Sequence, residues 1–513
     1  MRQEGSITAY LCLILTLMLS LIFGSLESVR YAHARVMTSC AMDQGLYSLF
    51  ARYDQVLLEQ YELFFVNGGS DDGSWQPDRL CQEIRETASK VLSPAPADGI
   101  LRVSPANGQI TEEYVSGFCL ATDQEGWAFS RQVCEAMKES LTSYGIQQLS
   151  QTLMKEEAVT DIQEQQKEAY EDNNIIEVYE EMKESGGESK ETESENREET
   201  ADKEEEQDRK EPDDGEESGE QEEVQVPDHF VNPIEVIRQV MQMGILSLVL
   251  PYGKGIPSGT ADTTQLASNR ELQSGFGIPI PEEEASFVDK LLTSEYVLWK
   301  FPCYTNQAGH PGLNCQVEYA IVGKDSDKEN LTGVVTQLLV LREAANLLHL
   351  MTDQGKRGEM ESMSAVIAAS IGLPAATGVI MAALAVCWAF AESVLDLREL
   401  LDGGKVALIK DASSWQLSLE HLPELLEKGD EYRKDISGGV DYRGYLRILM
   451  QKKTMEELTL ETMDLVEYNM RTLYGKENFR LDCCVDELSA GMRVEFGKRE
   501  YQITRNYGYR MET

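Results

Sequence analysis

A continuous apolar stretch lies at the start of the chain. Ile7–Leu26 contains 20 residues and no charged side chain. At 1.5 Å per residue, a helix of this length matches a hydrocarbon core about 30 Å thick. A cleaved secretory signal has a shorter apolar region followed by small residues at the cleavage site, and only Gly24 stands near such a position. The pattern therefore predicts a retained transmembrane helix, with residues 1–30 as a membrane anchor.

Helical periodicity continues beyond this stretch. Apolar residues recur three, four or seven positions apart, which places them on one face of a helix that ends at Asn67–Gly69. This set comprises Leu46, Leu49, Phe50, Tyr53, Leu57, Tyr61 and Phe64. Two arrangements fit equally well: one continuous helix from Ile7 to about Phe65, roughly 90 Å long, or an anchor followed by a separate core helix.

A second apolar stretch, Ile371–Ala389, has the length and composition of another span. It is rich in alanine and glycine, contains Pro374 and Thr377, and runs directly into charged positions from Glu392 onwards. We expect a buried helix of a soluble domain. The alternative, a second span, would return the C-terminus to the side on which the chain begins.

Residues 71–150 have the pattern of short helices and loops, because prolines interrupt the periodicity. After residue 226, Asn232 is a candidate N-cap and Pro233 the first residue of a helix. The alternation of apolar and polar positions in Gln316–Val322 predicts a strand.

Two further patterns complete the expected elements. Ser326–Glu329 is a capping box that precedes a helix over Val334–Met351. Arg493–Phe496 and Glu500–Thr504 flank Gly497, which predicts a C-terminal β-hairpin. The expected fold class is mainly α with small β elements.

Charge is distributed unevenly along the chain. Its 89 acidic residues exceed 46 basic ones, and 30 acidic against 8 basic residues lie in Lys155–Val226. Glu184–Glu223 lacks the apolar side chains that would offset the entropy of ordering, so we predict an acidic disordered linker over 155–226, although Lys155–Lys183 is compatible with a charged helix. A solvated spacer is the expected role, and a calcium-collecting or partner-binding role is the alternative.

This linker divides the chain into further parts. We expect a helical stalk and the first part of the soluble domain over 31–154, and a mainly helical domain with the C-terminal hairpin over 227–513. The acidic balance argues against a nucleic-acid partner, because such binding depends on clustered lysine and arginine.

A search for catalytic motifs finds little. Glycines 253, 255 and 259 surround Lys254, but no Gly-Lys-Ser/Thr follows, so a turn-rich connection is expected. The histidines at positions 33, 229, 310, 349 and 421 are isolated, and no Gly-x-Ser-x-Gly occurs. The sequence predicts no catalytic residues, no cofactor and no metal site, and we expect a protein that is not an enzyme.

Ten cysteines in 513 residues are too few for a disulfide scaffold. Cys303 and Cys315 flank a Gly-Pro loop and form a candidate disulfide if this region lies outside the cell. The adjacent Cys483 and Cys484 are expected to be free thiols.

Several segments carry a resemblance to a known family. The start of the chain, from Gly5-Ser6-Ile7-Thr8 to Leu26-Glu27-Ser28-Val29-Arg30, resembles an uncharacterised family of membrane-anchored Gram-positive bacterial proteins. Further similar segments are Asn232-Pro233 and residues 244–251, 318–331, 341–350, 388–410 and 463–470. The resemblance implies an association with tight-adherence (Tad/Flp) pilus genes and a TadE/TadG-like pseudopilin start, and it implies no enzymatic activity.

The pilin comparison suggests a processing site that this sequence matches only in part. Residues 1–5 resemble a prepilin leader, so Gly5 and Ser6 form a candidate leader-processing site. Type IV prepilins carry glutamate at the fifth mature position, whereas Tyr10 stands here and the next acidic residue is Glu27. The sequence therefore fits a stationary, anchored accessory component better than a subunit of the pilus shaft.

The charges flanking the span give a weak argument on orientation. Arg2 precedes the span, and Arg30 and Arg35 follow it, which mildly favours the C-terminal flank inside. The resemblance favours the opposite orientation, with a long transmembrane helix continuing into a helical extracytoplasmic domain. We expect a single-pass protein of the cell membrane on this basis.

Two classes of function follow. The first is a membrane-anchored structural or accessory component that contacts lipid through residues 7–26 and binds pilus or secretion machinery proteins. The second is an anchored extracytoplasmic hydrolase whose site is assembled from residues distant in the sequence. An exposed, partly apolar groove would favour the first class, and a convergent pocket with a perturbed carboxylate would favour the second.

Overall fold

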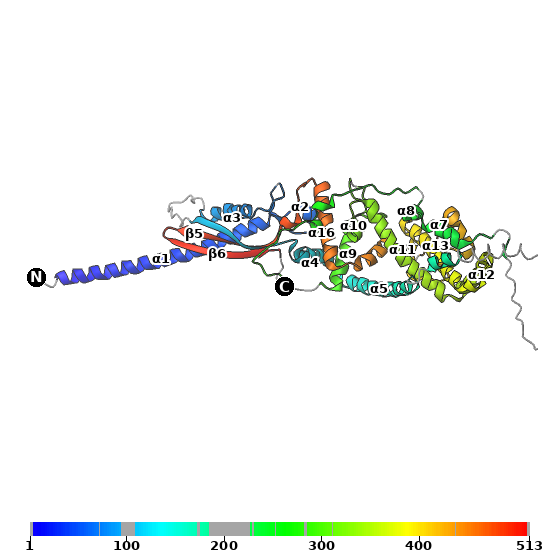
Figure 1. Ribbon diagram of the computed structural model, residues 1–513. Coiled ribbons are helices and arrows are strands. Elements are labelled where there is room, and N and C mark those ends of the chain that lie inside the picture. The colour runs from blue at the N-terminus through cyan, green and yellow to red at the C-terminus, as the bar shows by residue number, and fades with distance from the viewer. Residues whose placement is uncertain are drawn as a thin grey trace, which may run out of the picture. The chain divides into compact units, whose positions relative to one another are not determined.

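In the computed structural model of the protein, the chain forms two compact units (Figure 1). Unit 1 comprises Met1–Ser143, Ala261–Phe301 and Lys453–Thr513, and unit 2 comprises Tyr144–Thr260 and Pro302–Lys452. The structure describes residues 4–70, 72–93, 108–171, 175–183, 226–227, 230–251, 253–281, 285–309, 311–434, 436 and 438–509.

Unit 1 combines a long N-terminal helix, further helices and one antiparallel sheet. Its helices are α1 (Glu4–Phe50), α2 (Gln55–Tyr61), α3 (Pro77–Leu92), α4 (Asp123–Ser140), α9 (Phe287–Lys300) and α16 (Met455–Thr472), with short turns η1 (Thr263–Gln265), η2 (Ala267–Asn269) and η5 (Leu481–Cys483). Its strands are β1 (Val66–Asn67), β2 (Gln109–Leu120), β5 (Cys484–Phe496) and β6 (Arg499–Gly508).

Helix α1 changes character along its length. Every side chain from Ile7 to Arg30 is exposed, and Ala34 is the first buried residue. The helix over Ile7–Phe50 is long and apolar enough to cross a membrane, and none of its most apolar stretch is buried within the protein. The predicted apolar helix is thus present, and it continues into the folded part of unit 1.

The sheet of unit 1 is built around β5. β5 pairs antiparallel with β2 over most of its length, with β1 at its start and with β6 through the hairpin, where Phe496 lies opposite Arg499. The predicted C-terminal hairpin is confirmed, with Gly497 at φ 65° in the turn. Figure 1 shows β5 and β6 running beside α1 and α3.

The core of unit 1 lies between α1, α3 and this sheet. Ala41, Leu46, Ile84 and Val494 belong to one buried apolar cluster. Residues three or four positions apart on α1 face α3, because 3.6 residues make one helical turn. Gly45 lies in this contact, where an added Cβ would come within 2.8 Å of the Ile84 Cγ2.

Nearly all regular elements that the structure describes in unit 2 are helices. Its helices are α5 (Ser143–Glu171, which begins at the boundary), a segment at 175–183, α7 (Pro233–Met241), α8 (Ile245–Val249), α10 (Gln316–Val322), α11 (Asp327–Thr352), α12 (Gln354–Ile371), α13 (Thr377–Asp402), α14 (Leu425–Tyr432) and α15 (Tyr442–Gln451). Short elements are η3 (Pro374–Ala376), η4 (Leu419–Glu424) and the two-residue strands β3 (Lys405–Val406) and β4 (Val440–Asp441).

Helix α13 forms the centre of unit 2. Most of its side chains from Ile380 to Leu401 are buried, and Trp388 is fully buried, with its indole N–H donating to the Leu417 carbonyl at 3.0 Å. α13 and α11 are also long and apolar enough to cross a membrane, but both are partly buried within the unit. The expectation of a buried helix near Ile371–Ala389 therefore has the support of the packing.

A cluster of four charges is buried beside α13. The Lys410 ammonium lies 2.6 Å from Glu392 and 2.7 Å from Asp396, and Arg342 lies 3.0 Å from Asp396. Glu392 also accepts hydrogen bonds from two backbone N–H groups of the 410–417 segment. Two cations and two carboxylates thus balance one another where neither water nor salt screens them.

Two helix caps of unit 2 follow the sequence. Asn232 accepts a hydrogen bond from the Ile234 N–H with Pro233 at the first helical position, as predicted. Ser326 is the N-cap of α11: its hydroxyl oxygen accepts from the Glu329 N–H at 3.2 Å, and the hydroxyl donates to the Glu329 carboxylate at 2.8 Å, so half of the predicted capping box is present. These local contacts depend on residues only two or three positions apart, which is why the sequence reveals them.

Three expectations about elements were wrong. Gln316–Val322 is helix α10 and not a strand, because it is buried on nearly all sides and the apolar alternation reflects no single face. The helix from Ile7 does not reach Phe65: α1 ends at Phe50, and Asp54 caps the separate helix α2. Residues 71–150 contain the 12-residue strand β2 in addition to helices.

The expected linker coincides only partly with described residues. Helix α5 extends to Glu171, and residues 175–183 are helical, in agreement with the charged helix considered for Lys155–Lys183. The acidic core over 184–225 lies outside the described residues.

Candidate binding groove

Three segments of unit 2 that are distant in sequence surround an open groove of about 720 Å³. One wall is α12, which begins where the Asp353 side chain accepts from the Lys356 N–H at 2.9 Å and ends at Gly372 with φ 72°. The others are η4 and the residues before α7, including Pro227 and Phe230.

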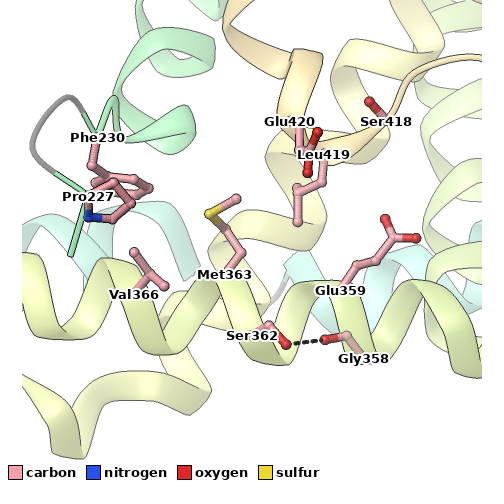
Figure 2. Close-up of a pocket in the computed structure, with 10 residues that line it drawn as sticks. All are labelled: Pro227, Phe230, Gly358, Glu359, Ser362, Met363, Val366, Ser418, Leu419 and Glu420. Carbon is pink, nitrogen blue, oxygen red and sulfur yellow. Dashed lines mark hydrogen bonds between the residues drawn. The ribbon is translucent and has the colours of Figure 1, made fainter. Parts of the chain in front are cut away.

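The floor of the groove is apolar. Figure 2 shows Met363 extending from α12 between Phe230 on one side and Leu419 on the other, with Val366 one turn further along. Met363 and Val366 are half-buried, whereas Ile367 on the same helix is fully buried in the unit. One face of α12 therefore packs on the core of unit 2, and a second row of apolar side chains on the same helix lines the groove.

The rim carries acidic and small polar groups. Glu359 and Glu420 face the opening, and the Ser362 hydroxyl donates to the Gly358 carbonyl at 3.0 Å within α12 (Figure 2). Glu359 forms a loose ion pair with Lys356 at 3.4 Å and keeps about half of its side chain exposed. Apolar side chains flanked by cations would fit such a lining, because the floor offers apolar area and the rim offers carboxylates.

The carboxyls with strongly perturbed pKa values lie elsewhere. Burial raises the pKa of Glu318 to about 7, although the Tyr304 N–H and the Tyr442 hydroxyl both donate to it at 2.8 Å. Burial also raises the pKa of Glu461 in unit 1 to about 7, despite the neighbouring Lys453. Neither of these two carboxyls lines the groove.

The predicted processing site and the predicted disulfide lie in different units of the protein. Gly5 and Ser6 lie in the first turn of α1. Cys303 and Cys315 are both buried in unit 2, and both are free thiols whose pKa is raised by burial and by the nearby Glu318. Processing at Gly5 and a disulfide between the two cysteines both stay predictions.

The other residues considered for chemistry have structural contacts. Lys254 pairs with Asp402 at 3.0 Å and lies near the C-terminus of α13, in agreement with a connecting turn. His349 packs against Trp415, and His421 against Tyr432. Cys483 and Cys484 are buried free thiols, as expected. Among the described residues, no three His, Cys, Asp or Glu side chains gather as metal ligands would.

Sequence reasoning did not identify the groove. Phe230, Met363 and Leu419 stand far apart in the chain, and each belongs to a pattern that also fits an ordinary core position. Only the folded unit brings them together at a surface.

Fold and groove define a mainly helical protein with a long apolar N-terminal helix and an open, partly apolar groove. The chain belongs to a family of unknown function (DUF5702), whose model matches residues 216–496, more than half of the chain. The match includes the groove and β5 but not α1. No curated protein and no solved structure matches the chain.

Proposed function

We propose that this protein is a single-span, membrane-anchored cell-surface component that acts through protein–protein contacts and is linked to Tad-type pilus or secretion machinery. The observation that carries the anchor is the exposure of every side chain from Ile7 to Arg30 in a helix whose first 20 residues, Ile7–Leu26, are uncharged and mostly apolar. An apolar helix surface of this size is unfavourable in water, and a bilayer removes it from water.

The groove on unit 2 supports the protein-binding part of the proposal. It is open, its floor is apolar, and its acidic rim offers charge complementarity to a basic segment of a partner. The link to pilus or secretion machinery comes from the resemblance of the N-terminal segment. The hydrolase alternative would need a carboxyl of perturbed pKa in the groove, whereas Glu318 and Glu461 lie away from it.

The orientation places everything after Arg30 outside the cell. An epitope tag after Thr513, followed by protease treatment of intact cells, tests this orientation. Loss of the tag while the anchored fragment remains in the membrane supports the proposal. Protection of the tag until lysis, with control surface proteins cleaved, would contradict it.

The groove is tested separately with two variants of α12. Val366→Asp places a charge on the apolar floor, whereas Ser370→Asp adds the same charge to an exposed position outside the groove. In vivo cross-linking to Tad pilus proteins should decrease with the first variant and persist with the second. Equal cross-linking by both variants would remove the groove from the proposal.

A further inference from the structure

A second cleft lies in unit 1, between α1 and the turn of the β5–β6 hairpin. It has a volume of about 490 Å³ and is lined by residues of two segments, Glu27–Ala34 and Phe496–Arg499. The hairpin packs against α1, and Figure 1 shows its turn beside the point where the helix extends away from the rest of unit 1.

The position of this cleft along α1 follows from its distance to the apolar stretch. Tyr31 is five residues beyond Leu26, so it lies about 7.5 Å further along the helix axis. The headgroup layer on each side of a bilayer is roughly 5–8 Å thick. If Ile7–Leu26 fills the hydrocarbon core, the cleft opens at the level of the lipid headgroups.

The charges that line the cleft are mostly positive. Arg30, Lys498 and Arg499 contribute three cations, and Glu27 contributes one carboxylate, which accepts a hydrogen bond from the Tyr31 hydroxyl. Over the described part of the chain, no ion pair joins any of the three cations to a carboxylate. The chain as a whole has a formal charge of −43, so the charge lining this cleft is opposite in sign to that of the chain.

The other arginines of the hairpin are paired. Arg493 lies 2.7 Å from Glu112 and 2.9 Å from Glu500, and Arg505 lies 3.3 Å from Asp43. Positive charges along the strands are therefore neutralised by neighbouring strands or by α1. The cations at the turn differ from these, and they lie at the end of the hairpin that is nearest the apolar stretch.

The cleft also holds one cation in a defined position. The Arg499 guanidinium carbon lies 3.3 Å from the centre of the Tyr31 ring. Stacking on an aromatic ring restricts the guanidinium while its N–H edge stays available, and that edge matches the oxygens of a phosphate. Lys498 at the exposed turn adds a flexible second donor.

We propose that this cleft binds the phosphate of an anionic phospholipid headgroup and thereby holds unit 1 against the membrane surface. The inference rests on the membrane anchor proposed above, since the apolar stretch brings the cleft to the headgroup layer. The inference adds to that proposal the class of lipid that is bound and the three side chains that bind its phosphate, which are Arg30, Lys498 and Arg499.

The test uses the full-length protein in lipid nanodiscs. Hydrogen–deuterium exchange of residues 494–502 is compared between discs of phosphatidylcholine alone and discs that also contain phosphatidylglycerol. We expect slower exchange at the hairpin turn with phosphatidylglycerol. Native mass spectrometry of the released protein should show retained phosphatidylglycerol, and Lys498→Gln should lower this retention about fivefold, since each cation near an anionic surface contributes on that scale.

The matched control is Lys138→Gln, which removes an exposed lysine of α4, and it should leave retention and exchange unchanged. Equal retention by wild-type and Lys498→Gln would overturn the proposal, as would equal exchange in both kinds of disc. Slower exchange of detergent-solubilised protein with inorganic phosphate alone would identify a free-anion site and overturn the lipid assignment. Protein that never enters the discs would contradict the anchor itself, which is a separate outcome.

Discussion

Lys410 is the residue on which the buried charge cluster of unit 2 depends most, because its ammonium group faces both Glu392 and Asp396. Lys410→Met leaves Glu392 without a cationic partner and Asp396 with only Arg342. Removal of one member of a buried ion pair typically costs about 3–5 kcal/mol. We expect a loss of this size in the free energy of unfolding, measured by urea denaturation.

Lys428→Met provides the control. Lys428 forms its ion pair with Glu424 at the surface, where half of the lysine side chain is exposed. Solvent screens such an exposed pair, so it contributes little to stability and the variant should unfold close to wild-type. If the two variants unfold at the same urea concentration, the buried cluster does not stabilise unit 2 in the way described.

Glu318 should make the stability of unit 2 depend on pH. Its folded pKa of about 7 exceeds the ordinary value of 4.5, so the folded state binds more protons than the unfolded state between these pH values. The contribution of protonated Glu318 to the unfolding free energy is fully present below pH 4.5, and it is lost as the pH rises through 7. The difference in unfolding free energy between wild-type and Glu318→Gln should therefore change over this window, by on the order of 3 kcal/mol.

Glu318→Gln is nearly isosteric and can still accept from the Tyr442 hydroxyl, so it changes the charge more than the packing. Urea denaturation of both proteins at a series of pH values gives the difference directly. A difference that stays constant from pH 4.5 to pH 7 would mean that Glu318 does not titrate in this range in the folded protein.

At the scale of elements, the contact between α1 and α3 allows little additional volume. A Cβ at Gly45 would approach the Ile84 Cγ2 within 2.8 Å and its carbonyl oxygen within 3.1 Å. Gly45→Val should therefore destabilise unit 1 by about 1–3 kcal/mol through overpacking. Thermal unfolding of the full-length protein in detergent measures this change.

Gly24→Val is the matched substitution on the same helix. Nothing lies within 4 Å of the position of its Cβ, because this part of α1 is outside the folded unit. It should leave the unfolding midpoint of unit 1 unchanged. A comparable loss for both variants would indicate a general effect of valine on α1 and not a close helix–helix contact.

At the scale of the whole molecule, the apolar stretch should be separable from folding. No side chain from Ile7 to Arg30 is buried, so deletion of residues 7–26 removes no core contact. We expect the deletion variant to move from the membrane to the soluble fraction and to keep the same unfolding midpoint. Cell fractionation with carbonate washing, followed by thermal unfolding, measures both properties.

Retention of the deletion variant in carbonate-washed membranes would contradict the single-span proposal. It would direct attention to α11 and α13, which have sufficient length and hydropathy but are partly buried within unit 2. Release from the membrane together with a lowered unfolding midpoint would instead mean that the apolar stretch contributes to the fold.

The sequence by itself determined the features that depend on neighbouring residues. The apolar stretch from Ile7, the N-caps at Asn232 and Ser326 and the hairpin around Gly497 all follow from composition or from spacings of two to four residues. Local hydrogen bonds and helical periodicity operate over these distances, so no knowledge of the rest of the chain is needed.

Only the tertiary structure decided the features that depend on distant residues. The sequence pattern of Gln316–Val322 fits a strand, but burial on nearly all sides makes it a helix. The charge cluster around Lys410, the groove around Met363 and the cleft beside Arg499 each combine segments far apart in the chain. Packing of buried side chains sets these contacts, and packing is a property of the folded chain that no local spacing contains.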